Sequence, residues 1–448
     1  MTGIDLTPFN PPTTPEYAQA GASFQLAAPV EPAGAFTARS VDDVVRAVAT
    51  ARRSGRPLRL STTGHAMGRT GPLTDSLLLR PLLDAPVRVD PATRTARIPA
   101  GKTWGDVVPE LTGHGLTALH GSSATVGVVG YLLGGGLSFY GRRFGLAANS
   151  VRSLTVVLAD GEIVETSATH RPELFWALRG GGGGFGVVVE AEIDLIPMRR
   201  IVTGMAVWDA ADAARLAPVW QAWAQTAPPE ITTSFRMLSL PPLPVLPPYL
   251  AGKRVLAVDG AVIASTEPDV PAAQRIADDM LSALSELAPP VANTWAEAAP
   301  ETLPLVHMDP QQPVPFQSDS ALLNEIDEAD WAQLLDAGPN LIALELRQLG
   351  GAFADAPADG GALGHFTAPL HYYGVGLAGA ATTRDLKAVR SALEPSLTGF
   401  TAPNFVDDFQ RPQRTYDDQI RARVERVRRA VDPAGLFAGD VAPTRDQA

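Results

Sequence analysis

The chain of 448 residues is predicted to have an α+β fold, and two hairpins and one helix-to-strand step carry this prediction. Residues 87–98 hold two short strand-like runs on either side of the turn Asp90–Thr93. Residues 154–166 fold back at Asp160-Gly161, and Asp-Gly strongly favours a short hairpin. Residues 40–61 place an amphipathic helix directly before a strand. Helices combined with antiparallel hairpins are typical of the α+β class.

The N-terminal elements follow in order from simple local signals. Residues 1–30 are rich in Pro, Thr and Ala, and we expect an irregular lead-in there. The first helix begins at Ser40, which caps it, and Asp43 completes a capping box. Gly55 ends this helix, and the strand Leu58–Ser61 follows. The buried face of the helix is expected to hold Val41, Val44, Val45 and Val48.

Three later elements are also predicted from local pattern. A helix is expected over Trp104–Leu111 and a strand over Val187–Leu195. Near the C-terminus, a helix ends at Asp432-Pro433. Its apolar stripe, which we expect to be buried, consists of Ile420, Val424, Val427 and Val431.

Composition excludes several classes of function. The formal net charge of -12 argues against a nucleic-acid partner, which requires a basic face, and favours a soluble protein. The absence of cysteine excludes disulfides and zinc-thiolate sites, and we expect no metal site. The first residues lack the pattern of a secretory signal, and no apolar run is long enough to span a membrane. We therefore expect a cytoplasmic monomer or homodimer with no membrane segment.

One turn after the strand Leu58–Ser61 presents a single imidazole. The segment Thr62-Thr63-Gly64-His65-Ala66-Met67-Gly68 places a glycine directly before the histidine. A lone histidine in a turn is most often an ordinary polar surface residue. A run of small residues further along the chain favours a functional role instead.

That run extends from Gly121 to Leu137 and continues to Leu146. Glycine allows backbone amides to approach a ligand closely, and consecutive N–H groups form a nest for an anion such as pyrophosphate. Glycines also mark bulges and tight packing, so the run alone is ambiguous. The chain has no P-loop and no Gly-x-Gly-x-x-Gly between a strand and a helix, so any phosphate is held in another way.

In order and spacing, these segments resemble the berberine-bridge-enzyme-like branch of the vanillyl-alcohol-oxidase/PCMH flavoprotein superfamily. The matches span roughly residues 30 to 440, and the closest resemblance is to actinobacterial members of unassigned substrate. The matching pieces are the Thr-Gly-His-x-x-Gly turn at His65, Gly121–Gly136, Arg143–Leu146, Leu174–Gly183, Pro403–Phe405 and Asp432–Phe437.

The resemblance implies a PCMH-type FAD-binding domain interrupted by an α+β substrate domain, whose antiparallel sheet is covered by helices. The family motifs are absent from residues 199–400 and resume after Phe400. We therefore predict the N-terminal part of the FAD-binding domain over 1–198, the inserted domain over 199–399 and a return to the first domain over 400–448.

The resemblance also implies FAD bound covalently through His65. Many members link the flavin a second time through a cysteine in the glycine-rich run, and Ser123 stands at that position here. The link is therefore expected through His65 alone. The other expected FAD contacts are Thr63, Gly64, Ala66, Met67, Gly68, Gly121, Ser122, Ser123, Thr125, Val126, Gly127, Gly130, Gly135, Gly136, Leu137, Val188 and Asn404.

The catalytic base is expected in an unusual place. Related enzymes often carry a tyrosine two residues before the asparagine of the C-terminal motif, but Ala402 precedes Asn404 here. In this family the central strands of the inserted domain face the flavin. Strand alternation puts Glu345 and Arg347 on one face, and a carboxylate whose pKa is raised by burial is a usable base. Glu345 is therefore the first candidate, and an internal salt bridge is the alternative.

Tyr372 and His307 are the second and third candidates. Tyr372 and His371 point to opposite faces of a following strand, so either can face the site, and buried aromatic packing is the alternative. His307 lies in the segment His307–Pro310, where it is interpreted as a loop histidine near the substrate. Metal ligation has little support because no third ligand is evident.

The resemblance predicts an oxidase that transfers a hydride to flavin N5 and then passes the electrons to O2. Few basic residues stand out in 199–400, so a small apolar, aromatic or glycosylated secondary metabolite is the expected substrate. The alternatives are an oxidative cyclase, a monooxygenase or a redox-neutral cyclase, which the loss of the usual tyrosine favours. A non-enzymatic flavin-binding module using Pro241–Pro248 is a further alternative, although this run also suits a stiff loop over a pocket.

Overall fold

The computed structural model describes residues 5–69, 71–409, 411 and 413–441. The first sheet has three parallel strands in the order β1-β3-β2: β1 Gly34–Ala38, β2 Leu58–Leu60 and β3 Leu77–Pro81. Helix α2, Val41–Ser54, packs against it with the predicted Ser40–Asp43 capping box and a left-handed Gly55 at its end. The lead-in is not wholly irregular, because Thr14 caps a short helix, α1, Pro15–Ala20.

A five-stranded antiparallel sheet contains both predicted hairpins. Its order is β4-β5-β9-β7-β8, and its strands are β4 Arg88–Asp90, β5 Thr95–Pro99, β7 Val151–Val157, β8 Ile163–Ser167 and β9 Val187–Asp194. The short strands β6 Leu116–Thr117 and β10 Ile196–Pro197 form a separate two-stranded antiparallel sheet. The helices of this part are α3 Trp104–Thr112, α4 Val128–Leu133, α5 Gly141–Phe144 and α6 Pro172–Leu178.

A separate eight-stranded sheet is built entirely from residues 200–377. Its strands are β11 Arg200–Asp209, β12 Ile231–Ser239, β13 Arg254–Ala264, β14 Ala292–Asn293, β15 Ala296–Ala298, β16 Phe316–Leu323, β17 Ala343–Gln348 and β18 Leu370–Leu377. All of its paired strands are antiparallel. The predicted combination of an α+β class with a helix-covered antiparallel sheet is confirmed.

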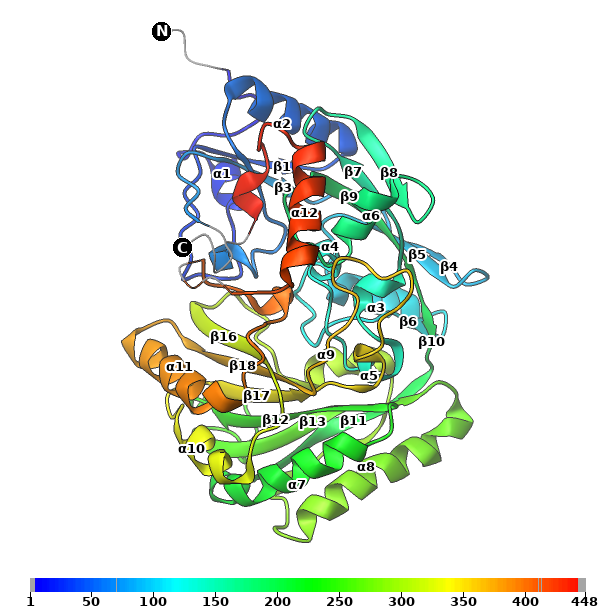
Figure 1. Cartoon of the computed structure of the whole chain (residues 1–448), viewed down its shortest axis with the longest axis vertical. Helices are drawn as coiled ribbons and strands as arrows, with labels where there is room; N and C mark the ends of the chain where they lie inside the picture. The colour runs from blue at the N-terminus through cyan, green and yellow to red at the C-terminus, as the bar shows by residue number, and fades with distance from the viewer. Residues whose placement is uncertain (1–4, 70, 410, 412, 442–448) are drawn as a thin grey trace.

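Helices cover one face of this sheet and leave the other for the site. The short helix α9, Leu303–Val306, contacts β11 and β13, but its Leu303 is buried in the core of the N-terminal part. The covering helices are α7 Ala213–Thr226, α8 Val270–Ser285, α10 Trp331–Asp336 and α11 Ala380–Ala392. Their apolar sides meet the strands in one core, in which Trp208, Trp220 and Trp331 are fully buried. In Figure 1, α7 and α8 lie on the far side of the sheet from the N-terminal strands.

The C-terminal segment returns to the N-terminal part of the molecule. Helix α12, Asp418–Val431, contacts α6, and Val424 and Val427 are buried in the core of that part. The amide of Leu58 in β2 donates to the carbonyl of Leu436. Figure 1 shows α12, in red, beside the blue and green elements. The three-part division at 198 and 399 remains a prediction, and these contacts support it.

Two further observations concern the predicted loops and membrane segments. The run Pro241–Pro248 lies in the loop between β12 and β13, where Leu243 and Val245 are exposed. No helix within the described ranges has the length and apolar character needed to cross a bilayer.

Candidate functional site

A cavity of about 540 Å³ lies between the first two sheets and the uncovered face of the eight-stranded sheet. Most of the predicted residues line it. They are Thr63, Gly64, His65, Ala66, Met67, Gly121, Ser122, Ser123, Val126, Gly127, Gly130, Leu137, Val188, Asn404, His307 and Glu345. Five predicted residues do not line it: Gly68, Thr125, Gly135, Gly136 and Tyr372.

His65 is held tightly on two sides. Its ring stacks on Phe24, with 3.9 Å between ring centroids and 16° between planes. Its Nε2 lies 3.0 Å from the Thr125 hydroxyl, which in turn lies 3.0 Å from the Ser123 hydroxyl. Burial lowers the pKa of His65 to about 4, although Asp309 opposes this shift. The imidazole is therefore neutral near pH 7. Thr125 does not line the cavity, but its hydroxyl contacts His65 Nε2 directly.

The glycines of the predicted cofactor segments serve two different purposes. At Gly130, which lines the cavity, an added Cβ would meet no atom within 4 Å, so the missing side chain leaves open space. At Gly135 and Gly136 the backbone φ is +97° and +75°, and a Cβ would collide with neighbouring side chains. Gly68 approaches the Asp407 carbonyl so closely that a Cβ would lie 2.3 Å from that oxygen. These last three glycines pack closely against their neighbours and do not line the cavity, and their contact with a cofactor stays a prediction.

Asn404 ties the C-terminal segment to the glycine-rich run. Its Oδ1 accepts from the Gly136 amide at 2.8 Å, and its Nδ2 donates to the Tyr131 carbonyl at 3.1 Å. Asn404 also lines the cavity, so its side chain holds the C-terminal segment and the glycine-rich run together at the cavity wall.

A buried ionic cluster lies on the sheet side of the cavity. Glu345 Oε1 accepts from Arg347 Nε at 2.7 Å, and Glu345 Oε2 lies 3.2 Å from His307 Nε2. The other side of His307 lies 3.0 Å from Asp259, which also pairs with Arg236 at 2.7 Å. All five side chains are at most 7% exposed. Strand register alone places Glu345 and Arg347 on one face, as predicted.

The protonation of this cluster differs from the prediction. Arg347 and His307 hold the pKa of Glu345 well below its usual value, although burial acts in the opposite direction. Asp259 and Glu345 raise the pKa of His307 to about 9 against burial and the charge of Arg236. Glu345 is therefore a stable carboxylate and His307 a cation near pH 7. The geometry matches the salt-bridge alternative and disfavours both residues as proton acceptors.

Tyr372 faces away from the cavity. It is fully buried among the helix-facing residues of the sheet, and burial raises its pKa well above the usual value. Strand alternation instead directs Tyr373, its neighbour, into the cavity opposite Glu345. The His371 ring lies tilted against Phe405, with 4.4 Å between ring centroids and 51° between planes, and does not line the cavity.

The sheet face changes from polar to apolar along the strands. One row across it holds Tyr373, Glu345 and Arg236. The next row toward the strand ends holds Val375, Ala343 and Leu238, and beyond it Phe316 pairs with Leu377. All of these side chains line the cavity.

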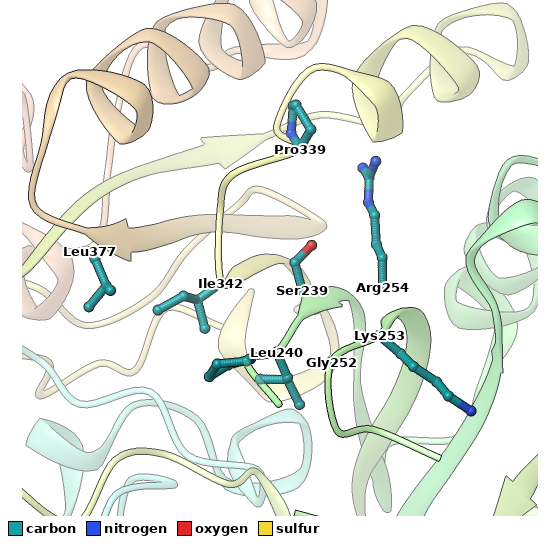
Figure 2. A pocket seen from close by; sticks show the side chains of 9 residues that line it. Ser239, Leu240, Gly252, Lys253, Arg254, Pro339, Ile342 and Leu377 are labelled. Atoms are coloured by element: carbon teal, nitrogen blue, oxygen red, sulfur yellow. The ribbon is translucent and has the colours of Figure 1, made fainter. Parts of the chain in front are cut away.

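A second hollow of about 420 Å³ lies beside the apolar end of the cavity. Leu240, Ile342 and Leu377 line both spaces, and Figure 2 shows them at the ends of the strands with Lys253 and Arg254 nearby. Pro241 and Gly252, the ends of the proline-rich loop, border this hollow. The loop position therefore fits the prediction of a stiff loop over a pocket.

Several lining residues escaped the sequence analysis. Arg236 and Tyr373 follow the same strand alternation that placed Glu345, so pairing the strands in register would have found them. Phe24 and Asp407 lie in irregular segments with no periodic signal. Among the described residues, no group of three or more acidic, histidine or cysteine side chains has metal-binding geometry.

Comparison with known proteins gives the site a context. Residues 32–167 match the model of an FAD binding domain. The chain is 39% identical over 184 residues to an FAD-dependent monooxygenase, FUP4, of Fusarium proliferatum, which covers 40% of this chain and 35% of that protein. It is 35% identical over 170 residues to (R)-6-hydroxynicotine oxidase of Paenarthrobacter nicotinovorans, covering 38% of this chain and 37% of that protein. The chain thus spans little more than a third of the length of these curated relatives.

Solved structures extend the likeness to the whole fold. The 6-hydroxy-D-nicotine oxidase of Arthrobacter nicotinovorans superposes with a TM-score of 0.81 at 20% identity, covering 99% of both chains. A glucooligosaccharide oxidase of Acremonium strictum, described with a 6-S-cysteinyl, 8α-N1-histidyl FAD, superposes with a TM-score of 0.79 at 21% identity over 97% of this chain and 96% of that chain. The chain therefore contains an FAD binding domain over residues 32–167 and shares the fold of these two oxidases.

Proposed function

We propose that the protein is an FAD-dependent oxidase whose flavin lies in the 540 Å³ cavity and is bonded to His65 alone. The observation that carries this proposal is the environment of His65. Its imidazole is neutral, stacks on Phe24 and contacts Thr125, and it lies at the wall of a cavity between the FAD binding domain and the eight-stranded sheet. A protonated imidazole has no lone pair for a new bond, so the lowered pKa supports the role.

The chain's own atoms indicate which nitrogen would form the bond. Thr125 engages Nε2, which makes Nδ1 the nitrogen for attachment. Ser123 has a hydroxyl where related proteins carry a thiol, and the chain has no cysteine, so a second thioether link is excluded by composition. The hydroxyl of Ser123 instead orients Thr125, and through it His65.

The remaining wall suits a large planar cofactor with a pyrophosphate. The space left at Gly130 would be filled by any larger side chain, and the Ser122–Gly127 segment brings backbone amides to the cavity. When bound, FAD supplies a two-electron acceptor for a hydride. The protein supplies orientation through Asn404 and charge through the Glu345–Arg347–His307 cluster. We assign this cluster a positioning role.

The sheet face supports an apolar substrate with one polar end. The polar row at Tyr373, Glu345 and Arg236 would meet the reacting group, and the aliphatic rows beyond it would cover the rest of the molecule. Burial of aliphatic surface is favourable at roughly 25 cal/mol per Å², whereas sugar hydroxyls placed there would lose hydrogen bonds to water. An aryl or alkyl alcohol therefore fits this face better than an oligosaccharide.

The decisive experiment is to denature the protein with acid and examine the precipitate. We expect it to remain yellow and the intact chain to carry the added mass of one FAD, whereas His65→Ala releases its flavin. A colourless wild-type precipitate would refute the covalent link. Anaerobic reduction by 4-methoxybenzyl alcohol, followed by one equivalent of H2O2 on re-aeration, tests the oxidase activity.

A monooxygenase is the second candidate, because Ala402 replaces the tyrosine expected in related oxidases. The likeness to FUP4 supports the same alternative. Re-aeration separates the two, since a monooxygenase would incorporate oxygen into the product and release less than one equivalent of H2O2. The expectation of a monomer or a homodimer can be tested by measuring the mass of the protein in solution.

A further inference from the structure

Three polar side chains from distant parts of the chain meet at the cavity wall. Tyr373 belongs to β18, Ser318 to β16, and Asp407 follows the Asn404 segment. Ser318 pairs with Val375 in the antiparallel register, so it is the diagonal neighbour of Tyr373 on the same face. Diagonal neighbours on one sheet face are within reach of each other when one side chain is long. All three residues line the cavity.

Asp407 is an unusual carboxyl. Its Oδ2 accepts a hydrogen bond from the Ser318 hydroxyl, while its buried Oδ1 has no partner among the described residues. Burial raises the pKa of Asp407 to about 6. The Ser318 hydroxyl and Arg411 oppose this rise, and Asp408 and Asp319 add to it.

Tyr373 connects this carboxyl to the interior of the cavity. Its ring packs edge-on against Phe405, with 5.1 Å between centroids. Burial and the charge of Asp407 raise the pKa of its phenol, and a polar contact with the Ser318 hydroxyl acts in the opposite direction. The phenol is therefore protonated and can lose its proton only when another group accepts it.

The other titratable groups beside Tyr373 are poor acceptors. Glu345 faces it across the strands, but its pKa lies well below the usual value, so it binds protons weakly. His307 has a pKa of about 9 and already carries its proton near pH 7. A general base works best when its pKa lies near the working pH, and among these groups Asp407 comes nearest.

We propose that Tyr373, Ser318 and Asp407 form a proton relay that replaces the tyrosine absent at Ala402. This inference rests on the proposed oxidase function. As the substrate alcohol becomes a carbonyl, its O–H proton passes to Tyr373 Oη. The Tyr373 proton passes to Ser318 Oγ, and the Ser318 proton passes to Asp407 Oδ2. The C–H hydrogen leaves with its electron pair for the bound flavin. Tyr373 is the catalytic residue, and Ser318 and Asp407 act through it.

The first test needs no substrate. Infrared titration of the holoenzyme should show two protonated carboxyls that ionise near pH 6, because the pKa of Asp440 is also raised to about 6. Asp407→Asn should remove one of them. Ser318→Ala should move that ionisation to higher pH, since its hydroxyl stabilises the carboxylate. The proposal fails if Asp407→Asn leaves both ionisations, or if Ser318→Ala shifts neither.

The second test measures anaerobic flavin reduction by 4-methoxybenzyl alcohol across pH. In the wild type, the rate should fall as pH drops through about 6, because a protonated Asp407 cannot accept a proton. Tyr373→Phe should slow reduction roughly 10²–10⁴-fold. Asp407→Asn should slow it and abolish the ionisation near pH 6 from the profile. Tyr372→Phe is the matched control, since its buried hydroxyl has no partner among the described residues and faces away from the cavity.

The two proposals fail in different ways. Each variant is first checked for bound flavin and for complete bleaching by dithionite, which does not use the relay. A wild type without FAD would refute the oxidase function. Variants that hold FAD yet are reduced as fast as the wild type would refute the relay alone. If 4-methoxybenzyl alcohol leaves the wild-type flavin oxidised, the infrared titration decides.

Discussion

The buried ionic cluster makes the stability of the protein depend on the charge of His307. Its pKa rises from 6.5 to about 9 in the folded protein, which corresponds to a free energy of the order of 3 kcal/mol. Because the folded-state pKa is the higher one, this stabilisation is complete below pH 6.5 and is lost as pH rises through about 9. The glutamine variant His307→Gln keeps a similar size but cannot become cationic. It should be destabilised most at pH 6, and the difference should shrink toward pH 10.

The assay is urea unfolding of wild type and His307→Gln at several pH values between 6 and 10. The groups that titrate elsewhere, including Asp407 and Asp440, are common to both proteins and largely cancel. His114→Gln is the control, because His114 is exposed and lies outside the buried cluster. A wild-type–variant difference that stays constant from pH 6 to 10 would refute the assignment of a cationic His307.

Three further predictions concern the cofactor wall. Asn404→Ala removes two hydrogen bonds and should destabilise the protein by about 1–3 kcal/mol in thermal unfolding and lower its flavin content. Gly130→Leu should reduce the amount of bound FAD measured by absorbance, since its Cβ meets no atom within 4 Å and the side chain extends into open space at the cavity wall. An unchanged FAD content would place the cofactor elsewhere. Thr125→Val should slow flavin attachment in a time course by mass spectrometry because His65 loses its Nε2 partner, and an unaffected rate would show that stacking on Phe24 alone holds the ring.

Local signals explain which parts of the fold could be predicted. The helix after Ser40, the turn at Asp160-Gly161 and the stripe of the C-terminal helix each depend on residues close in sequence, and the structure has all three. The short helix α1 was missed because its Thr14 cap and Pro15 start lie within a stretch dominated by irregular composition. The glycine-rich run was recognised as a unit, but the sequence could not separate glycines that border the cavity from glycines that pack against their neighbours. That distinction depends on packing in three dimensions: Leu363, far along the chain, lies against Gly135, and Tyr131 and Ala147 lie against Gly136.

The catalytic candidates show why charge is harder to predict than position. Alternation along β17 placed Glu345 on the cavity face correctly, but burial alone suggested a raised pKa. The opposite result comes from Arg347 on the same strand together with His307 and Arg236, which reach Glu345 from a loop and from β12. Burial instead raises the pKa of Asp407, and one of its two oxygens has no partner among the described residues; Asp440 resembles it in both respects. A base in such a site is therefore identified by the burial of each carboxylate and by the charges around it, and neither spacing nor composition carries that information.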